Sequence, residues 1–200
     1  MEKILVATRN IGKAQEFKAL FEPRGYQIET LHDYADLPEI EETGKTFAEN
    51  ARLKAEKISQ LTNRIVIGDD SGLMVEALDG APGIYSARYS GEDHNDRANN
   101  KKLLEELEGL EPARRKAKFH TSLAVAGPGK ETLMIEGEVE GRILTEARGN
   151  NGFGYDPLFF HEESQKTLAE LSAEEKNDIS HRGNALKNLD KEWEGWINNG

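Results

Sequence analysis

The chain has 200 residues, 36% hydrophobic and 32% charged, so the sequence predicts one soluble globular domain over 1–200 rather than a disordered chain. The net charge of −11 argues against a nucleic-acid partner, since proteins that bind nucleic acid are usually basic, and the lack of cysteine excludes disulfides and thiolate metal sites. No stretch is long and apolar enough for a membrane helix or a signal peptide, so we expect no membrane partner and a cytoplasmic location.

Predicted strands and helices alternate through the first part of the chain. Apolar residues spaced along one helix face indicate the helices, and short apolar runs indicate the strands. Thr46 is expected to cap the second helix, with Glu49 completing a capping box. In chain order the predictions are a strand at 3–8, a helix at about 12–22, a strand at 26–31, a polar loop at 32–45, a helix from Thr46 to about Leu61 and a strand at 64–68.

The second part of the chain adds a predicted hairpin and three helices. Two alternating strands are joined through the sequence GPGKE, which is typical of a hairpin. Strand–helix alternation followed by a hairpin predicts an α/β fold with a mixed sheet. In chain order the predictions are a loop at 79–91, a helix from Asn95 or Asp96 to about Glu108, strands at 118–126 and 132–144, a glycine-rich loop at 148–157 and two helices capped by Ser172 and Ser180.

The sequence ATRNIGK at 7–13 places a glycine-bearing turn between the first predicted strand and helix. Backbone N–H groups and the helix dipole attract anions at such a turn, while Lys13 adds a charge and Asn10 adds hydrogen-bond donors. Neither the P-loop pattern nor the dinucleotide-binding glycine pattern is present. The turn therefore indicates either a phosphate site or an ordinary strand-to-helix connection.

Four acidic residues flank the second predicted helix and the strand after it. Glu41 and Glu42 precede the helix, and Asp69 and Asp70 follow the strand. Carboxylates that converge at a strand end can hold Mg²⁺ when substrate phosphates complete its coordination shell. The alternative is a solvated acidic loop and an aspartate that caps a turn. The adjacent aspartates are harder to explain by this alternative, so they favour the metal site.

The glycine-rich sequence GNNGFGYDP at 149–157 carries groups suited to a purine base. The rings of Phe153 and Tyr155 offer flat surfaces, Asp156 offers a hydrogen-bond acceptor, and the glycines allow the backbone to approach a ligand closely. The alternative is a wide loop whose aromatic side chains fill the core.

The sequence EEKNDISHRG at 174–183 gathers Lys176, His181 and Arg182 near a helix start. Arginine can grip a phosphate with two hydrogen bonds or stack on a base, and lysine acts as a point charge. The alternative is a solvated helix junction capped by Ser180. A basic group of this kind in an acidic protein favours an anionic ligand.

The distribution of acidic residues favours an Mg²⁺-dependent enzyme acting on a nucleotide phosphate over a non-catalytic nucleotide-binding module. A pure binder has little use for clustered acids, whereas an enzyme needs them for a metal and for a base that activates water. A phosphatase with an aspartate nucleophile would show a D-x-D spacing, which these adjacent acids lack. Zinc and serine-hydrolase chemistry are disfavoured, since H-x-x-x-H and G-x-S-x-G are absent.

The whole chain resembles the inosine triphosphate pyrophosphatase family, also known as Ham1-like or dITP/XTP pyrophosphatases. The resemblance rests on the stretches ATRNIGK, EETGKTFAENARLKA, DDSGLMVEALDGAPGIYSARYSG, GFGYDPLFF and SHRGNAL, which occur in the family's order and spacing. It implies an elongated α/β fold with a long curved mixed sheet and two lobes around a cleft. It also implies a homodimer that uses Mg²⁺ to hydrolyse ITP, dITP and XTP to the monophosphate and pyrophosphate, removing deaminated purines from the nucleotide pool.

The resemblance also assigns roles to residues of this sequence. Glu41 and Asp70 are expected to hold the metal, Asp70 to act as the proton acceptor, and Phe153 to stack on the base. Arg9 departs from the commonest family residue at its position, so the role of its side chain stays open. The residues expected to bind the substrate are Thr8, Arg9, Asn10, Ile11, Gly12, Lys13, Lys54, Ser71, Phe153, Gly154, Tyr155, Asp156, Lys176, His181 and Arg182.

Overall fold

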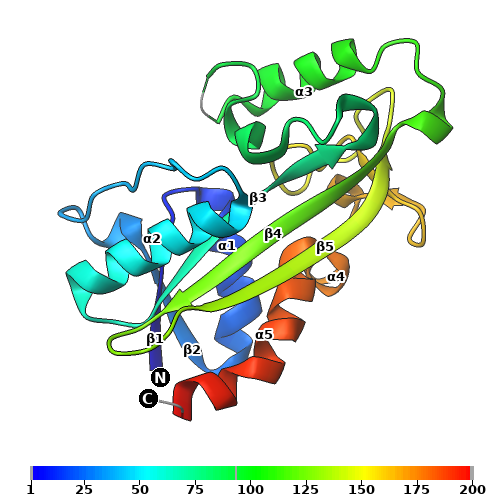
Figure 1. Ribbon diagram of the computed structural model, residues 1–200. Coiled ribbons are helices and arrows are strands. Elements are labelled where there is room, and N and C mark those ends of the chain that lie inside the picture. The colour runs from blue at the N-terminus through cyan, green and yellow to red at the C-terminus, as the bar shows by residue number, and fades with distance from the viewer. Residues whose placement is uncertain (1, 93, 199–200) are drawn as a thin grey trace. The chain divides into compact units, whose positions relative to one another are not determined.

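The computed structural model describes residues 2–92 and 94–198, which fold into helices and one mixed sheet (Figure 1). The described helices are α1 (Ile11–Phe21), α2 (Phe47–Thr62), α3 (Asp96–Glu106), α4 (Ala173–Ile179) and α5 (His181–Asn198). The described strands are β1 (Glu2–Val6), β2 (Tyr26–Thr30), β3 (Val66–Val75), β4 (Lys116–Ala126), β5 (Leu133–Ile143), β6 (Phe159–His161) and β7 (Lys166–Thr167).

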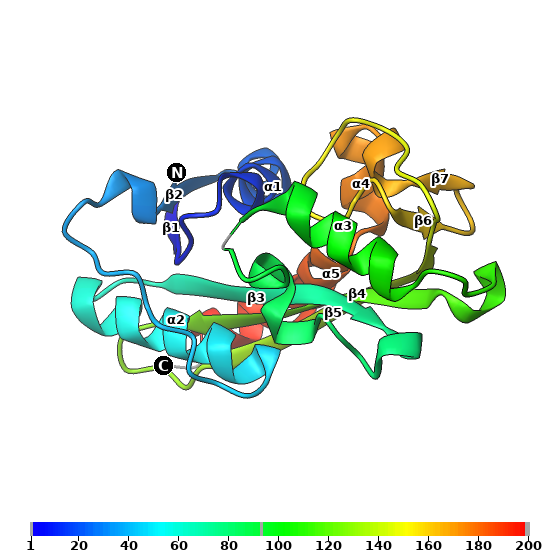
Figure 2. The same ribbon diagram turned by 90° about the horizontal axis from the view of Figure 1, so that it is seen from above.

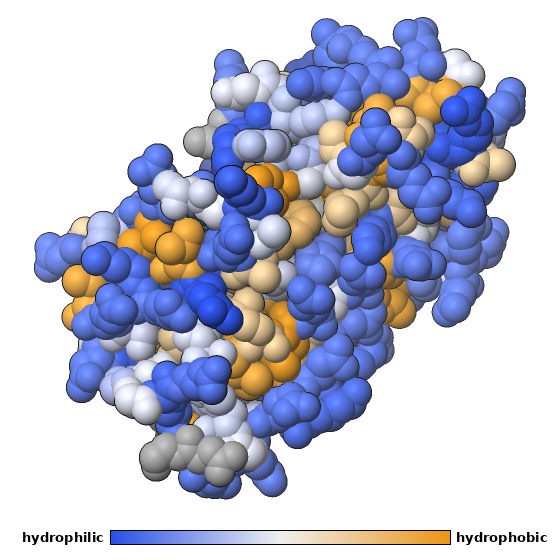
Figure 3. Space-filling view, in the orientation of Figure 1, coloured by the Kyte–Doolittle hydropathy of each residue, from blue (hydrophilic) through white to orange (hydrophobic). Residues whose placement is uncertain are grey.

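The seven described strands form one sheet in the order β2-β1-β3-β4-β5-β6-β7. Strand β1 pairs in parallel with β2 and β3, whereas β6 pairs antiparallel with β5 and β7, which confirms the predicted mixed α/β sheet. Among residues 2–92 and 94–198, no helix is both long and apolar enough to cross a membrane. Hydrophilic side chains cover most of the face shown in Figure 3.

The chain divides into two compact units, and the predicted single domain stays a prediction. Unit 1 comprises Met1–Asp70, Thr121–Gly137 and Arg182–Gly200, and unit 2 comprises Ser71–His120 and Glu138–His181. The boundaries fall within β3, β4 and β5 and at the start of α5. Each unit has its own hydrophobic core.

In unit 1, helices cover both faces of the sheet (Figures 1 and 2). On one face, α1 and α5 pack on β1 through residues such as Phe17, Leu186 and Val6. On the other face, α2 packs on β1 and β3, where Ile58 meets Leu5 and Val66. Side chains of β3 that point to opposite faces of the sheet therefore meet different helices.

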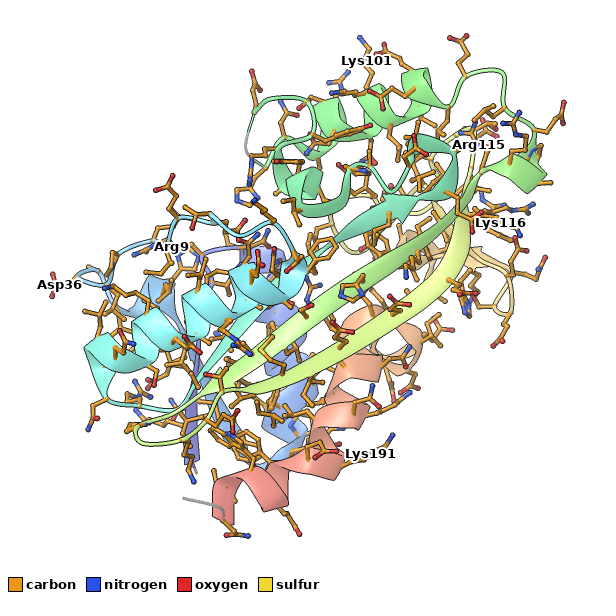
Figure 4. All side chains as sticks on the ribbon, in the orientation of Figure 1. Arg9, Asp36, Lys101, Arg115, Lys116 and Lys191 are labelled. Carbon is orange, nitrogen blue, oxygen red and sulfur yellow. The ribbon has the colours of Figure 1, made fainter. Side chains whose placement is uncertain are left out.

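In unit 2, the core joins α3 to β3, β4 and β5 through residues such as Leu103, Val75 and Ile143. Arg115, labelled in Figure 4, is buried immediately before β4. Its guanidinium donates to the backbone carbonyls of Leu107 (2.7 Å), Ile143 (2.8 Å) and Leu144 (2.8 Å). These bonds tie the end of α3 to the end of β5.

Strand β3 differs most from its prediction. The apolar pattern predicts a strand that ends at Gly68, but β3 continues to Val75, so Asp69 and Asp70 lie within the strand rather than at its end. The residues at 69–72 are polar or glycine, so the apolar pattern does not continue through them. Leu73 and Val75, which follow them in the strand, are fully buried. The structure therefore places two carboxylates in the middle of a sheet, where each needs specific partners.

Gly68 explains how α2 comes close to these carboxylates. A Cβ atom at Gly68 would lie 2.1 Å from the backbone oxygen of Ala51 and 2.9 Å from the backbone nitrogen of Ala55, both in α2. No real Cβ atom tolerates such a distance from a rigid backbone, so only glycine allows β3 and α2 to pack here. This close packing brings the side chains of α2 within reach of Asp70.

The helix caps are mostly as predicted. Thr46 accepts a hydrogen bond from the backbone N–H of Glu49 (3.1 Å), and Asn95 accepts one from Ala98 (3.0 Å). The predicted reciprocal half of the first capping box is wrong, because the Glu49 carboxylate accepts from the N–H of Lys45 (2.6 Å) instead of Thr46. The sequence SAEE at 172–175 also predicts a capping box, and this one is confirmed in full, with Ser172 and Glu175 as its two members.

Candidate functional site

The adjacent aspartates of β3 are separated by the geometry of the strand. Successive side chains of a strand point to opposite faces of the sheet, and the contacts here follow that rule. Asp69 contacts residues of α1 and α5, whereas Asp70 contacts residues of α2. Two carboxylates that are neighbours in the sequence thus lie in different environments.

Asp69 is enclosed by cations. Its side chain is fully buried and pairs with the Lys13 ammonium (Nζ–Oδ1 2.5 Å) and the Arg182 guanidinium (Nε–Oδ2 3.0 Å). The Thr121 hydroxyl donates a further hydrogen bond to Oδ2 (2.8 Å). Burial alone would raise the pKa of Asp69, but the charges of Arg182 and Lys13 outweigh it and hold the pKa well below its usual range. Asp69 is therefore a stable anion that organises two basic side chains.

Arg182 has a second carboxylate partner in α1. Its Nη1 atom lies 2.5 Å from Oε2 of Glu16, and the guanidinium is almost entirely buried. The group of Lys13, Glu16, Asp69 and Arg182 thus balances two positive charges with two negative ones. Such a network fixes the directions of the Lys13 and Arg182 side chains.

Asp70 is buried beside side chains of α2. Its Oδ2 atom accepts a hydrogen bond from the Asn50 amide (2.9 Å), and the Lys54 ammonium lies 3.8 Å from its Oδ1 atom. Burial raises the pKa of Asp70, and the nearby Glu42 carboxylate raises it further, against the lowering effect of Lys54 and Lys13. A buried carboxylate of raised pKa in a group of charged side chains is typical of a site that binds a cation or moves a proton.

The acidic loop, residues 39–46, supplies Glu42 to this environment. The Glu42 carboxylate accepts a hydrogen bond from the Lys54 ammonium (2.5 Å), so Lys54 lies between Glu42 and Asp70. The side chain of Glu41, the expected metal ligand, is exposed. Its role as a metal ligand stays a prediction. Of the two glutamates that the sequence offered in this loop, Glu42 is the one that shares Lys54 with Asp70.

The turn at 7–13 has the local geometry of an anion site. Asn10 caps α1 by accepting a hydrogen bond from the Lys13 N–H (3.0 Å), and the buried Thr8 hydroxyl accepts one from the Asn10 N–H (3.1 Å). The first turn of α1 carries no acidic residue to offset the helix dipole. Ile11 is 65% exposed, so its contribution to binding would come from its backbone, as for Gly12.

The Arg9 side chain contacts the loop that follows β2. Its guanidinium donates to the backbone carbonyls of Leu31 (3.0 Å) and Leu37 (2.8 Å). Figure 4 shows it beside the loop that leads towards α2. The side chain therefore holds this loop in place, whereas the sequence left a phosphate contact and an outward direction open.

In unit 2, the turn at 152–156 forms a compact group with Lys176. The Lys176 ammonium pairs with the buried Asp156 carboxylate (2.6 Å) and lies 5.0 Å from the centre of the Phe153 ring. The Asp156 carboxylate also accepts a hydrogen bond from the Phe153 N–H (2.9 Å). A Cβ atom at Gly152 would lie 2.1 Å from Oδ2 of Asp156, so glycine is required there. One face of the Phe153 ring is thus covered by a cation that Asp156 fixes.

The residues between Phe153 and Asp156 have structural partners. The Gly154 N–H donates to the Asp96 carboxylate (2.7 Å), and its carbonyl accepts from the Asn100 amide (2.9 Å). Tyr155 lies in the core of unit 2, and its hydroxyl donates to the Ser86 carbonyl (2.7 Å). The core-filling alternative therefore describes Tyr155, whereas Phe153 is only partly buried.

His181 and Ser71 complete the expected residues of unit 2. The His181 ring is buried and stacks on the Phe119 ring, with centres 5.0 Å apart and planes inclined by 15°. Ser71 is partly buried and directly follows Asp70 in β3. His181 directly precedes Arg182 at the start of α5, and its stacking fixes the plane of the imidazole.

Comparison with known proteins identifies the family. The sequence model of the Ham1 family matches residues 4–192. The chain belongs to the Ham1 family. It is 58% identical over 189 residues to the dITP/XTP pyrophosphatase of Bacillus licheniformis, covering 94% of this chain and 96% of that protein. It is 57% identical over 192 residues to the dITP/XTP pyrophosphatase of Listeria monocytogenes, covering 96% of this chain and 95% of that protein.

A solved structure agrees with the family assignment. The Ham1 protein of Staphylococcus aureus is 44% identical to this chain, with a TM-score of 0.85, and the match covers 97% of this chain and 99% of that one. The resemblance seen in the sequence motifs is therefore confirmed for the family and for the fold class.

Sequence reasoning missed three residues of this Ham1-family site: Glu16, Asn50 and Thr121. Asn50 had a usable signal, because it lies four residues before Lys54 on the buried face of α2, among Phe47, Ala51, Ala55 and Ile58. A polar residue on an apolar helix face needs a buried partner. Glu16 and Thr121 gave no such signal, since their partners come from distant parts of the chain.

The carboxylates of unit 1 fit an Mg²⁺ ion that is shared with a substrate. Within the part of the chain that the structure describes, no three histidine or acidic side chains are grouped into a complete metal site. Mg²⁺ in nucleotide enzymes is usually held by one or two carboxylates and by substrate phosphates. The buried Asp70 and a glutamate of the acidic loop meet that requirement in number and in chemistry.

Proposed function

We propose that this chain hydrolyses non-standard purine nucleoside triphosphates (XTP, dITP and ITP) to the monophosphate and pyrophosphate, and so clears deaminated purines from the nucleotide pool. The observation that carries the proposal is the contrast between the two aspartates of β3. Asp69 is neutralised by two cations, whereas Asp70 is buried with its pKa raised. The names of the two bacterial relatives, dITP/XTP pyrophosphatases at 57–58% identity, support the same substrate class.

The residues of unit 1 suit the phosphate chemistry. Lys13 and the N-terminus of α1 would bind phosphate oxygens, and Lys54 would add a second charge. Asp70 and Glu41 or Glu42 would hold Mg²⁺, which supplies charge neutralisation when bound. The Asp70 carboxylate would accept a proton from the water that attacks the triphosphate, and pyrophosphate leaves.

The residues of unit 2 suit recognition of the base. A purine would stack on the Phe153 ring, whose other partner is the Lys176 ammonium. The 6-keto group of xanthine or hypoxanthine would accept a hydrogen bond from His181 or from a backbone N–H of the turn at 152–156. The 6-amino group of adenine would leave that donor unpaired, which is costly in a buried site.

Arg182 acts indirectly in this proposal. Its guanidinium is held by Asp69 and Glu16, so its charge would reach the substrate as part of the network that orients Lys13. The homodimer and the cytoplasmic location that the family resemblance implies belong to the same proposal. The protein would then act on free nucleotides rather than on nucleic acid, in keeping with its net charge of −11.

A substrate panel tests the selectivity of this proposal. Pyrophosphate release should be faster with XTP, dITP and ITP than with ATP by about two or more orders of magnitude in kcat/KM, because adenine leaves a buried donor unpaired. A coupled pyrophosphate assay with Mg²⁺ measures these rates, and heat-denatured protein serves as the blank. Equal kcat/KM for ATP and XTP would contradict a role in clearing deaminated purines.

A further inference from the structure

Asn50 uses both ends of its side-chain amide. The residue is fully buried in α2, its Nδ2 atom donates to Oδ2 of Asp70 (2.9 Å), and its Oδ1 atom accepts from the N–H of Gly44 (2.8 Å). Gly44 belongs to the acidic loop, and Asp70 belongs to β3. A single side chain therefore joins the two segments that carry the carboxylates of unit 1.

The acidic loop packs directly on this amide. A Cβ atom at Gly44 would lie 2.6 Å from Oδ1 of Asn50 and 2.7 Å from Cβ of Glu49. Because there is no room for a side chain at this position, the backbone of the loop approaches Asn50 as closely as a hydrogen bond requires. The distance between the loop and β3 is thus set by one amide group.

Only an amide can make this connection at this length. Asparagine donates at one end and accepts at the other, whereas aspartate has no donor for a carboxylate and leucine offers neither group. The bond to Oδ2 also orients the Asp70 carboxylate, so that Oδ1 is the oxygen on the Lys54 side. Both the direction of Asp70 and the position of the loop follow from Asn50.

We propose that Asn50 is a positioning residue, which holds the acidic loop against Asp70 so that carboxylates from both segments can bind one divalent cation. The inference rests on the proposed function, since it assumes that Asp70 and a glutamate of the loop share the metal. Residues that orient metal ligands in this way usually change metal affinity or activity 10–100-fold when they are removed. Asn50 itself would touch neither the metal nor the substrate.

A purely structural role is the alternative, and Asn99 provides a matched control for it. Asn99 is also a buried amide in a helix, where it accepts from the Ser90 N–H (2.8 Å) and donates to the Ala87 carbonyl (3.1 Å). Among the described residues, its hydrogen-bond partners are backbone groups of Ser86, Ala87 and Ser90, and none is a carboxylate. Replacing Asn99 removes a buried amide without disturbing the contacts of Asp70.

The test compares Asn50→Ala, Gly44→Ala and Asn99→Ala in the full chain. Binding of Mn²⁺ alone, followed by electron paramagnetic resonance, should weaken about 10–100-fold for Asn50→Ala and change little for Asn99→Ala. Gly44→Ala displaces the loop from Asn50 without altering Asp70, so its Mn²⁺ affinity should fall in the same direction. With XTP, the Mg²⁺ concentration at half-maximal rate should rise for the first two variants only.

Each outcome bears on the proposal. Wild-type Mn²⁺ affinity and Mg²⁺ requirement in folded Asn50→Ala would overturn it, as would equal losses in Asn50→Ala and Asn99→Ala. If Asn50→Ala does not fold, Gly44→Ala decides, and unchanged Mn²⁺ affinity in that variant overturns the positioning role. A wild-type protein that binds Mn²⁺ but does not hydrolyse XTP would contradict the proposed function, whereas a loss of Mn²⁺ affinity confined to Asn50→Ala and Gly44→Ala would still support the positioning role.

Discussion

Replacing Asp69 by asparagine is expected to lower the free energy of unfolding by about 3–5 kcal/mol, because it leaves two basic side chains without their shared carboxylate. Arg182 is buried and pairs with Asp69 at 3.0 Å, and Lys13 pairs with it at 2.5 Å. Breaking a buried ion pair by removing one partner costs far more than removing an exposed pair. In the variant, Arg182 keeps its ion pair with Glu16, whereas Lys13 loses its ion pair with Asp69.

Urea unfolding at several pH values measures this effect. The pKa of Asp69 is lowered in the folded state, so its stabilisation is present above the usual pKa near 4 and is lost as the pH falls further. The wild-type protein should therefore lose more stability than Asp69→Asn between about pH 5 and pH 2. Asp36→Asn, at the exposed position labelled in Figure 4, serves as the control. If Asp69→Asn lowers the free energy of unfolding by less than about 1 kcal/mol, as the loss of an exposed ion pair does, the ion pairs of Asp69 do not support the fold.

Replacing Asp70 by asparagine is expected to lower the rate of XTP hydrolysis by about 10²–10⁴-fold, the usual contribution of a general base. The asparagine oxygen can still accept the hydrogen bond from Asn50, so the substitution removes mainly the charge and the basicity. The free energy of unfolding should stay the same or increase, because burial raises the pKa of Asp70 and its ionised form costs the folded state energy at neutral pH.

Measuring both the rate and the stability of Asp70→Asn distinguishes a catalytic role of Asp70 from a structural one. Pyrophosphate release from XTP and urea unfolding are measured on the same preparation, again with Asp36→Asn as the control. Turnover close to that of the wild-type protein would contradict the role of Asp70 as base and metal ligand. A loss of several kcal/mol in stability would instead show that Asp70 supports the fold as Asp69 does.

Local sequence signals predicted the elements around the site well. Thr46 and Asn95 cap helices as expected, and the run of apolar residues in α2 marks its buried face. Short-range hydrogen bonds and helix periodicity decide these features, and both are visible within a few residues. The mixed sheet followed from the same signals.

Contacts between residues that are distant in the sequence could not be predicted from local patterns. The sequence places Asp69 beside Asp70 among the acids that could surround a metal, but their side chains point to opposite faces once β3 continues through them. The cations that make the burial of Asp69 possible come from the first and last helices of the chain. No local pattern indicates that Lys13 and Arg182 meet at this carboxylate.

The candidate site was predicted in part. The charged residues Lys13, Lys54 and Lys176 were recognised, and each has a carboxylate partner in the structure. The role of Arg9 in holding a loop could not be predicted, because its partners are backbone carbonyls. Asn50 lies inside α2 rather than at its cap, so its position on the buried face is the only local sign of its role.

Cleavage of XTP to the monophosphate and pyrophosphate is tested most directly by phosphorus NMR of the products formed with Mg²⁺. The proposed chemistry predicts xanthosine monophosphate and pyrophosphate in equal amounts, with no orthophosphate at early times. Formation of orthophosphate and the nucleoside diphosphate would contradict it, as would the absence of any product with folded protein.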